Sequence, residues 1–437
     1  MKHPLITLAL LACTVCPATL QAQESAPFVN PFPSQLSVAH TWNRSLAKKA
    51  GRVLGARMAR EGVREVALPD LTVDTGKDRK DGYLNLYGQS PYLTAETGVE
   101  MVKGLQTDGQ LKAYVRIDSK EHSAPYVRPW QRVVEEAHAA GIASQAQQKA
   151  TDGITLTGAD DEEFRATALQ VARESVTLLK NAGGVLPLDT TWVHALGVSG
   201  DAPLVADMMP ALKQALSCPV STNTRTADAI VVFEDDDIDR RRLDSLALEG
   251  KPLVLVLLNS RPIDLQGADD TAAAVIEAWH PGQQGTTAIA EVLAGTCNPG
   301  GKLTAAFPGA YAFGHGLSYS DFRYTDLRIE PAETTTDGSV SVRFRVTNTG
   351  TRPGAEVVQV YLVDEESSTP LMSPKLEACK RTNIDPGQTK DVKFTIRRRN
   401  MVLLGTDGQW TVEPGFFTVR VGSSSDDIRL QGRFQVK

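Results

Sequence analysis

The stretch from Ala274 to Tyr319, in the middle of the chain, constrains the fold more than any other part of the sequence. It begins with a short apolar run, Ala274–Trp279, which predicts a buried strand. After a Pro-Gly turn, the pattern predicts a helix over Thr286–Ala294 that ends at Gly295, because glycine readily adopts the left-handed conformation of a helix C-terminal cap. After a second Pro/Gly turn, we predict another strand over Lys302–Phe307.

Two further apolar runs precede this stretch, at Ala229–Phe233 and Leu253–Leu258. Unbroken Val/Leu runs are typical of parallel strands that are covered on both faces. Before them, we predict a helix with Asp160 as its N-cap and Glu163 reaching back to the cap. Together these elements predict an α/β sandwich over residues 160–322.

The N-terminal half, residues 26–150, also alternates between helix and strand patterns. Apolar residues at helical spacing and short apolar runs indicate five elements: helices over Arg44–Arg60, Pro91–Leu105 and Tyr126–Ala140, and strands over Val63–Leu68 and Ala113–Ile117. This alternation favours a parallel α/β unit.

The pattern changes to alternating apolar and polar residues in the last part of the chain, residues 323–437. Four segments read as strands: Val340–Val346, Val357–Leu362, Val392–Ile396 and Phe417–Val421. They are separated by turns rich in Asn, Pro and Gly, so this part is predicted to be a β-sandwich.

Composition limits the classes of function. The 437 residues carry a formal net charge of −6, without the basic patch that a nucleic-acid-binding protein needs. Residues 1–22 predict a secretory signal peptide, with Lys2 before an apolar core, Leu5–Val15, that is too short to span a bilayer. We therefore expect an exported protein, periplasmic or secreted, without a membrane span. Cys13 leaves lipoprotein cleavage as an alternative.

The cysteines of the sequence do not indicate a disulfide framework, a metal site or a cofactor. Removal of the signal peptide leaves Cys218, Cys297 and Cys379, which are too widely spaced for a disulfide framework or a zinc site. We expect buried or free thiols, no bound metal and no cofactor.

The central stretch resembles a known family. The motifs EAWHPGQQGTTAIAEVLAGTCNPGGKL and FGHGLSY are similar to the C-terminal α/β domain of glycoside hydrolase family 3, the β-glucosidases and β-xylosidases. The segment FRATALQVARESVTLLKNAGGVLPL resembles the linker into that domain, and the last part of the chain resembles the family's fibronectin-III-like module. The resemblance implies hydrolysis of terminal non-reducing β-linked glucose or xylose, with a carbohydrate as the partner.

The N-terminal half resembles a shortened form of the family's (β/α)8 barrel. The segments FPSQLSVAHTWNRSLAKKAGRVLGARMA and GYLNLYGQSPYLTAETGVEMVKGLQ carry the likeness, which is strongest to the β-xylosidase branch. About 120 residues separate Phe32 from Thr151, whereas such a barrel usually needs about 250. In addition, the family's nucleophilic aspartate lies in a Ser-Asp-Trp context, which does not occur in this sequence. We therefore expect a truncated barrel segment and a degenerate site.

Glu234 is the candidate acid/base. A retaining glycosidase needs two carboxyl groups about 5–5.5 Å apart, one as nucleophile and one as proton donor. The resemblance implies that the donor lies in the loop Phe233–Arg240, where Glu234 precedes the run Asp235–Asp237. Adjacent carboxylates raise one another's pKa, as a proton donor requires, although a solvated acidic loop has the same property. The loop lacks the glycine and the spacing of a calcium loop.

Four residues are candidates for sugar binding: Asp74, Asp78, His122 and His315. The positions that match the family's sugar-binding Arg and Glu hold Gly82 and Leu84 here, and the family's Lys-His pair is missing. His122, with Lys120, is either a displaced substitute for that pair or part of a solvated loop. His315 is either functional or fixes a loop between domains.

Three hypotheses follow: a family-3 β-glycosidase, a non-catalytic remnant that binds carbohydrate or a partner, and a fragment completed by another chain. An aspartate among Asp74, Asp78 and Asp118 within about 6 Å of Glu234 would favour the enzyme. An open parallel sheet exposes edges that chains usually cover, so the third hypothesis predicts a homodimer through the open barrel edge.

Overall fold

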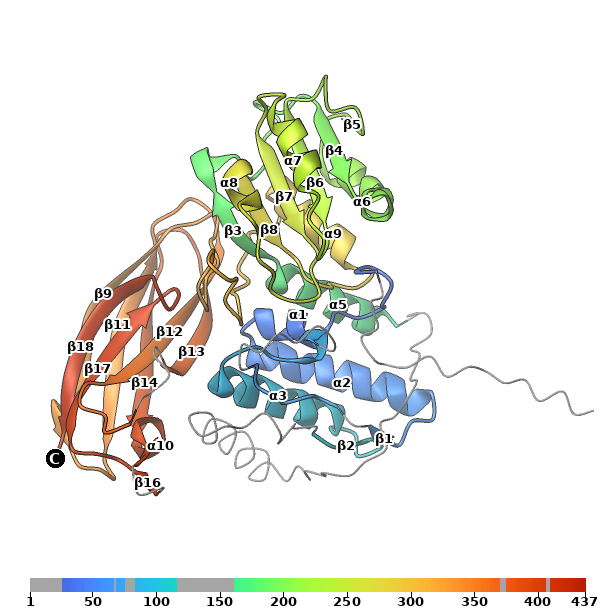
Figure 1. Cartoon of the computed structure of the whole chain (residues 1–437). Helices are drawn as coiled ribbons and strands as arrows, with labels where there is room; N and C mark the ends of the chain where they lie inside the picture. The colour runs from blue at the N-terminus through green and yellow to red at the C-terminus, as the bar shows by residue number, and fades with distance from the viewer. Residues whose placement is uncertain (1–25, 67, 75–82, 116–160, 370–374, 406–408) are drawn as a thin grey trace, which may run out of the picture.

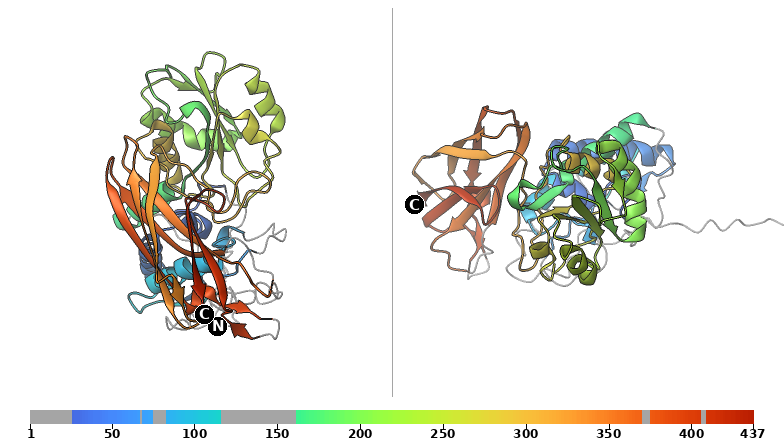
Figure 2. Two further views of the ribbon diagram at one scale, coloured as in Figure 1. Left: turned by 90° about the vertical axis from the view of Figure 1, so that its left-hand side faces the viewer. Right: turned by 90° about the horizontal axis from the view of Figure 1, so that it is seen from above.

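Figure 1 shows the computed structural model, which describes every residue except 1–25, 67, 75–82, 116–160, 370–374 and 406–408. The chain forms three units: N-terminal helices (blue), an α/β unit (green and yellow) and a β-sandwich (orange and red). Figure 2 shows, from above, that the sandwich lies beside the other two units. The predicted signal peptide lies outside the described residues. Among the residues that are described, no helix is long and apolar enough to cross a membrane.

The α/β unit is built on a six-stranded sheet in the order β3-β8-β7-β6-β4-β5. Its strands are β3 (Thr177–Asn181), β4 (Leu196–Gly200), β5 (Val220–Ser221), β6 (Ala229–Glu234), β7 (Leu253–Leu257) and β8 (Ala274–Glu277). The predicted strands β6, β7 and β8 are confirmed, and they pair in parallel. β3, which was not predicted, runs antiparallel to β8 and forms an edge of the sheet.

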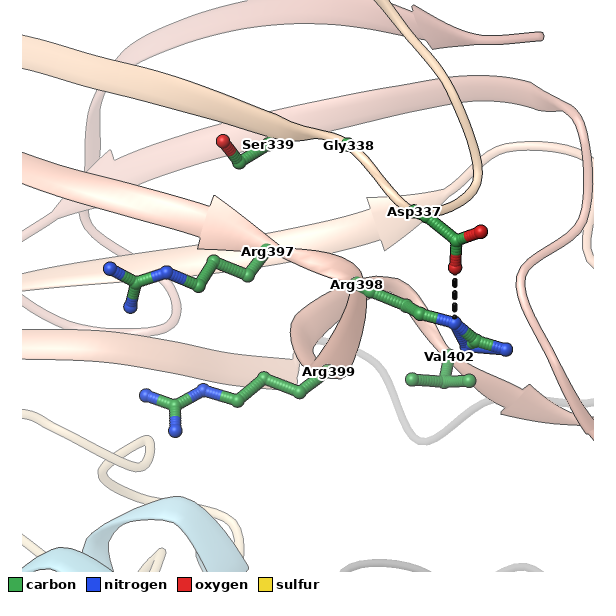
Figure 3. A pocket seen from close by; sticks show the side chains of 7 residues that line it. All are labelled: Asp337, Gly338, Ser339, Arg397, Arg398, Arg399 and Val402. Carbon is green, nitrogen blue, oxygen red and sulfur yellow. Dashed lines mark hydrogen bonds and ion pairs between the residues drawn. The ribbon is translucent and has the colours of Figure 1, made fainter.

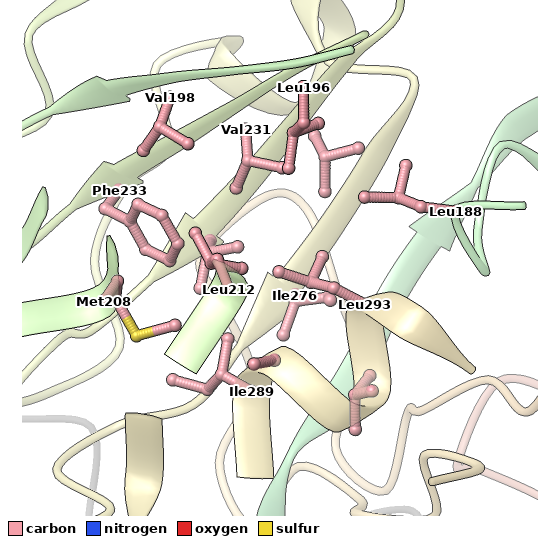
Figure 4. Packing of buried hydrophobic residues seen from close by; sticks show 14 of the residues in the cluster. Leu188, Leu196, Val198, Met208, Leu212, Val231, Phe233, Ile276, Ile289 and Leu293 are labelled. Carbon is pink, nitrogen blue, oxygen red and sulfur yellow. The ribbon is translucent and has the colours of Figure 1, made fainter. Parts of the chain in front are cut away.

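Helices cover both faces of this sheet, so its central strands β6, β7 and β8 are apolar except for Glu234 and Glu277 at the ends of β6 and β8. On one face, α6 (Ala202–Ala215) and α9 (Gly285–Ala294) pack on residues such as Val231 and Phe233 (Figure 4). On the other face, α7 (Arg240–Ala247) and α8 (Ala268–Thr271) pack on Ile230 and Val232. The prediction for α9 is confirmed, including Gly295 as its left-handed cap at φ 76°.

The N-terminal unit contains one parallel β–α–β element within the described residues. Its strands β1 (Glu65–Val66) and β2 (Lys112–Ala113) pair in parallel, and α3 (Pro91–Leu105) connects them. This is the repeating element of a (β/α) barrel, but both strands are shorter than predicted. The predicted helix Tyr126–Ala140 lies outside the described residues.

The helices of this unit pack closely. α2 (Arg44–Arg60) and α3 have the predicted bounds. In the sequence, α1 (Gln35–His40) precedes α2, and the 3-10 turn η1 (Tyr83–Asn85) lies between α2 and α3. A Cβ on Gly51 would lie 2.1 Å from the Met101 carbonyl oxygen, and one on Gly104 would lie 2.1 Å from that of Lys48. Glycine at these two positions therefore lets α2 and α3 approach to backbone contact.

Both predictions for the start of α5 (Glu162–Ser175) are wrong. α5 is capped by Asp161 instead of Asp160, because the Asp161 side chain accepts hydrogen bonds from the backbone N–H groups of Glu163 and Phe164 at 3.0 and 3.3 Å. The Glu163 carboxylate pairs with Arg52 of α2 instead of reaching back to the cap.

The predicted strand Lys302–Phe307 does not form. Its backbone groups bond within the loop and to the N-terminal unit: Leu303 N–H donates to the His315 carbonyl at 2.8 Å, and Phe307 N–H donates to that of Tyr311 at 2.8 Å. Thr304 N–H donates to the ring of His40 at 3.2 Å. Most residues of Lys302–Phe307 are as buried as those of a core strand, but their backbone groups bond to loop residues and side chains instead of to a neighbouring strand.

The C-terminal unit is a β-sandwich, as predicted, of a five-stranded sheet (β10-β18-β17-β12-β13) and a three-stranded sheet (β14-β11-β9). Its elements are β9 (Phe322–Glu330), β10 (Glu333–Thr334), β11 (Ser339–Asn348), β12 (Gly354–Asp364), β13 (Lys375–Ile384), β14 (Thr389–Arg397), α10 (Arg398–Met401), β15 (Leu403–Leu404), β16 (Trp410–Thr411), β17 (Gly415–Gly422) and β18 (Ile428–Val436). The four predicted strands are confirmed within β11, β12, β14 and β17. Inward-facing residues such as Val342, Val360 and Val419 form the core.

Arg381 of β13 connects the sandwich to both other units. Its Nη1 donates to the carbonyl oxygens of Thr41, at 3.1 Å, and Gly300, at 2.6 Å. Its Nε lies 3.2 Å from the carboxylate of Glu174 in α5. The three units therefore share one largely buried cation.

We predict that Arg381→Ala lowers the free energy of unfolding by roughly 3 kcal/mol, because it leaves Glu174 and two carbonyl groups without their shared donor. The neighbouring Lys380 is exposed, so Lys380→Ala should change stability by less than about 0.5 kcal/mol. Urea denaturation of the two variants measures both values. Equal stability of the two variants would contradict the structural role of Arg381.

Candidate active site

Polar side chains gather at the carboxyl ends of β6, β7 and β8, the edge at which open parallel sheets bind ligands. Glu234 is the last residue of β6, Asn259 follows β7, and Glu277 is the last residue of β8. Glu234 is in register with Leu257 of β7, which in turn is in register with Glu277. The sheet therefore brings these side chains to one edge.

Glu234 is buried but still has polar partners. Its side chain is 2% exposed, its Oε1 accepts from Arg242 Nη1 at 3.0 Å, and its Oε2 accepts from the Asp239 backbone N–H at 3.3 Å. Burial raises the pKa of Glu234 to about 7, against the opposing effects of the Asp239 N–H and Arg242. The group therefore exchanges its proton near neutral pH, as a general acid does.

The other carboxylates of the acidic loop have local partners. Asp236 accepts hydrogen bonds from the backbone and the hydroxyl of Ser260, after β7. Asp239 is the N-cap of α7, and Asp235 accepts from the Asp237 backbone N–H at 3.0 Å. Burial also raises the pKa of Asp235. The loop is thus a hydrogen-bonded turn that positions Glu234.

Glu277 is a second buried carboxyl group that the sequence did not indicate. It is fully buried and accepts from Trp279 N–H at 2.7 Å and from Asn259 Nδ2 at 3.2 Å. Burial raises the pKa of Glu277 well above the usual range of a carboxyl group, which favours the protonated form. In that form, and with the Asn259 amide flipped, the Glu277 O–H would donate to Asn259 Oδ1, which has no other partner among the described residues.

Two further buried groups at this edge have no hydrogen-bond partner among the described residues. They are His280 Nδ1 and Trp279 Nε1. Burial lowers the pKa of His280 to about 4, so the ring is neutral, although the carboxylate of Asp236 acts in the opposite direction. Buried polar atoms are normally hydrogen-bonded, so unpartnered ones mark positions that a ligand or a water molecule would complete.

His40, at the end of α1 in the N-terminal unit, was also not predicted as a site residue, and it connects that unit to this edge of the sheet. Its Nδ1–H donates to the Leu36 carbonyl at 2.7 Å, and its Nε2 accepts from Thr304 N–H at 3.2 Å. The ring lies 4.5 Å from that of Trp279. Burial lowers the pKa of His40 to about 3, which keeps Nε2 available as an acceptor.

Of the four predicted sugar-binding residues, the structure describes Asp74 and His315, and each of them has a hydrogen-bond partner within the protein. Asp74 is buried and accepts from the Tyr83 hydroxyl at 3.0 Å. His315 Nε2–H donates to the Leu179 carbonyl at 2.8 Å, its ring stacks on Tyr311, and burial lowers its pKa. Asp78 and His122, together with Asp118, lie outside the described residues. The carboxylates that act on the pKa of Glu234 are those of Asp239 and Asp201, so its pairing with Asp74 stays a prediction.

The sequence signal for the missed residues was weak. His40, Glu277 and His280 stand singly in the sequence, and contacts such as the one between the His40 ring and the Thr304 N–H join segments that are far apart in the chain. In the described part of the chain, no group of three or more His, Cys, Asp or Glu side chains is placed to hold a metal ion. Cys218, Cys297 and Cys379 are free thiols.

We predict opposite outcomes for two changes at Glu277. Glu277→Gln should cost less than about 1 kcal/mol, because burial favours the neutral carboxyl group and a neutral amide of the same shape can replace it. Glu277→Ala should cost about 2–4 kcal/mol, because it leaves buried donors unpaired. Thermal or urea unfolding at pH 7 distinguishes them. An equally large loss for Glu277→Gln would mean that the group is ionised.

The raised pKa of Glu234 also predicts a pH-dependent stability. The folded protein holds this proton between about pH 4.5 and 7, whereas the unfolded chain releases it, so stability falls as pH rises through this window. Glu234→Gln should remove about 3 kcal/mol of that fall. Urea denaturation of both proteins at pH 4.5 and pH 8 measures it. Parallel pH profiles for the two proteins would show that the pKa is not raised.

Two family models match the chain. Residues 220–337 match the glycosyl hydrolase family 3 C-terminal domain, which includes Glu234, Asn259, Glu277 and His280. Residues 356–425 match the fibronectin type III-like domain, which corresponds to most of the β-sandwich.

Curated relatives carry glycosidase names. A beta-xylosidase of Formosa agariphila is 27% identical over 389 residues, which cover 68% of this chain and 54% of the relative. A periplasmic beta-glucosidase of Salmonella typhimurium is 33% identical over 234 residues, which cover 45% of this chain and 30% of the relative. The chain thus spans about half the length of the first relative and less than a third of the second.

Solved structures share the fold. A beta-glucosidase from Listeria innocua, crystallised with laminaribiose, superimposes with a TM-score of 0.80 at 17% identity, over 94% of this chain and 86% of that chain. The same α/β and fibronectin-III-like arrangement thus recurs in a multidomain glycosidase fold. The matched models thus place a glycosyl hydrolase family 3 C-terminal domain at residues 220–337 and a fibronectin type III-like domain at residues 356–425, and the names of the relatives support the same family.

Proposed function

We propose that the chain is a β-glycosidase that removes terminal non-reducing β-linked glucose or xylose, with Glu234 protonating the leaving oxygen. The observation that carries the proposal is a buried carboxyl group with a pKa of about 7 at the carboxyl end of β6, within the matched family domain. The names of the relatives support the substrate class.

Arg242 and the Asp239 N–H would set the proton affinity of Glu234. Both favour the carboxylate and oppose the effect of burial, which keeps the pKa of Glu234 near neutrality instead of higher. In such a mechanism the protonated group donates to the glycosidic oxygen and then removes a proton from the incoming water. We assign no nucleophile; Asp74, Asp78 and Asp118 remain the aspartates to test.

Several features of the organisation are part of the proposal. We infer a truncated barrel segment over residues 26–150, an α/β sandwich over 160–322 and a fibronectin-III-like sandwich over 323–437. We also infer export through the signal peptide at residues 1–22, in keeping with the periplasmic location in the name of one relative. Sugar contacts from Asp78, His122 and His315, and dimerisation through the open barrel edge, stay predictions.

One contact favours a second function, a non-catalytic carbohydrate-binding remnant. Arg242 lies 3.0 Å from the Glu234 carboxylate, and such a pair stabilises the charged form, which cannot donate a proton. The sequence also lacks the Ser-Asp-Trp motif of the family's nucleophile.

Hydrolysis of nitrophenyl β-glucoside and β-xyloside by the purified mature protein tests the proposal. Glu234→Gln should lower kcat/KM by about 10²–10⁴-fold, the usual contribution of general acid–base catalysis. The loss should be smaller with a dinitrophenyl β-xyloside, because a better leaving group needs less protonation. Wild-type activity should also decline as pH rises through about 7, since the donor loses its proton.

Glu249→Gln serves as the control, because Glu249 pairs with Lys251 and Thr224 at a distance from the sheet edge. It should retain full activity. No turnover of either substrate by a cooperatively folded wild-type protein would leave the binding remnant as the better account. Turnover that persists in Glu234→Gln would assign the acid role to another group.

A further inference from the structure

The two outer faces of the β-sandwich differ in their contacts. The five-stranded sheet packs against the rest of the protein: Val357 and Tyr361 of β12 belong to one apolar cluster with Trp42 and Leu93 of the N-terminal unit. The outward-facing residues of the three-stranded sheet, β14-β11-β9, are largely exposed. This second face is therefore available to a partner.

A row of three cations crosses this exposed face. Arg343 of β11 is directly opposite Arg328 of β9 on one side and Lys393 of β14 on the other. Neighbouring strands lie about 4.8 Å apart, so the three side chains stand side by side. Like charges directly opposite one another are destabilising, which makes such a row unfavourable without a counter-charge.

The adjacent row on the same face shows how a cation is normally neutralised. Arg345 lies between two carboxylates, with Asp326 at 3.3 Å and Asp391 at 3.2 Å. Arg343, in contrast, donates to the hydroxyl of Ser341 at 3.3 Å. Within the described residues, no carboxylate pairs with Arg328, Arg343 or Lys393. Glu330 of β9 lies on the same face, opposite Ser341 and beside this row, but it forms no ion pair with these cations within the described residues. The three cations therefore lack a paired counter-charge in the described sandwich.

Two more arginines extend the row toward the end of β14. Arg397 follows Lys393 on the same face, and with Arg399 of α10 it lines a surface pocket of about 530 Å³. Figure 3 shows the side chains of Arg397 and Arg399 extending to the same side, whereas Arg398 turns to Asp337, with which it pairs at 2.9 Å. Arg397 and Arg399 have no acidic partner among the described residues.

We propose that this cationic face, formed by Arg328, Arg343, Lys393, Arg397 and Arg399, binds a linear acidic polysaccharide through its uronate carboxylates. A polymer with a carboxylate on each sugar supplies a row of anionic groups to a row of cations. The choice of a polysaccharide rests on the proposed function, which places the chain among carbohydrate-active proteins.

The neighbouring side chains suit this partner better than a membrane or a nucleic acid. Ser339, Ser341 and Thr395 place hydroxyl groups between the cations, where they can bond to sugar hydroxyls. Phe394 packs against Phe344 in the core, so it offers no surface on which a base could stack. The exposed large apolar side chains of the described residues, Val29, Leu248 and Leu317, lie elsewhere in the chain and cannot anchor this face in lipid.

The overall charge makes the test selective. The whole chain carries a formal net charge of −6, so polyanions are repelled except where cations are concentrated. Binding of a polyanion by this protein therefore has to come from a local surface. Such binding should weaken as salt increases, because exposed charges are screened.

Affinity electrophoresis of the full-length mature protein in gels that contain polygalacturonate tests the proposal. The wild-type protein should be retarded in these gels, but not in gels with a neutral mixed-linkage β-glucan, and the retardation should fade with added NaCl. The triple variant Arg328→Gln, Arg343→Gln, Lys393→Gln should bind at least about tenfold more weakly, since each close charge pair contributes on the order of fivefold in affinity in water.

Arg433→Gln is the matched control, because it removes the same type of charge from β18 in the other sheet, where Arg433 lies 3.4 Å from Glu365. It should bind like the wild-type protein. Unchanged far-ultraviolet circular dichroism and melting temperature establish that each variant is folded. The assay measures no hydrolysis, so it is independent of whether Glu234 is catalytic.

Three results would overturn the proposal. They are a wild-type protein that polygalacturonate does not retard, a triple variant that binds as well as the wild type, and tighter binding to phosphatidylglycerol vesicles or single-stranded DNA than to polygalacturonate. The last result would assign the cationic face to a phosphate-bearing partner.

Discussion

The arrangement of the three units depends on the backbone hydrogen bonds of one loop, Gly300–Leu317. The loop has no helix and little strand pairing, yet much of it is buried, so its N–H and C=O groups need partners from elsewhere. The N-terminal unit supplies His40 and Gln89, the edge strand β3 supplies Leu178, and the sandwich supplies Arg381. Because these partners come from all three units, none of them can move away without leaving buried polar groups unpaired.

The same loop and the sheet edge beside it hold most of the buried ionisable groups described above. His40, Glu234, Glu277 and His280 lie at this edge, and Lys302 lies in the loop itself, where burial lowers its pKa. Burial thus favours the neutral form of each group. A sheet edge that raises the pKa of its carboxyl groups and lowers the pKa of its imidazoles is a suitable setting for proton transfer, whatever substrate it receives.

Local elements were well predicted from the sequence, whereas non-local ones were not. The helix Pro91–Leu105 has the predicted bounds because its signals are local: Ser90 caps it and proline occupies its first position. The strand prediction for Lys302–Phe307 was wrong because an apolar pattern indicates burial but not the hydrogen-bond partners. One of these partners, His40, lies about 260 positions away in the sequence. β3 was missed as a strand because its pairing with β8 joins segments about 100 residues apart.

The candidate site was predicted in part for the same reason. Glu234 was identified because the family motif and the acidic run are contiguous in the sequence. Glu277 gave no signal, because a single Glu after an apolar run is as typical of the exposed end of a strand as of a buried site. Only the structure shows that Asn259 lies beside it. The cationic face was also invisible, because Arg328, Arg343 and Lys393 become neighbours only through the strand register.

The bond between Trp42 Nε1 and the Lys302 carbonyl, at 2.9 Å, joins residues 260 positions apart and has a consequence in time. At synthesis rates of roughly 5–20 residues per second, Lys302 emerges about 13–50 s after Trp42. During that interval the indole of Trp42 and the ring of His40 have been made, but their acceptor and donor have not. The N-terminal helices therefore keep apolar surface exposed, and these two polar groups lack their native partners, until the centre of the chain has been synthesised.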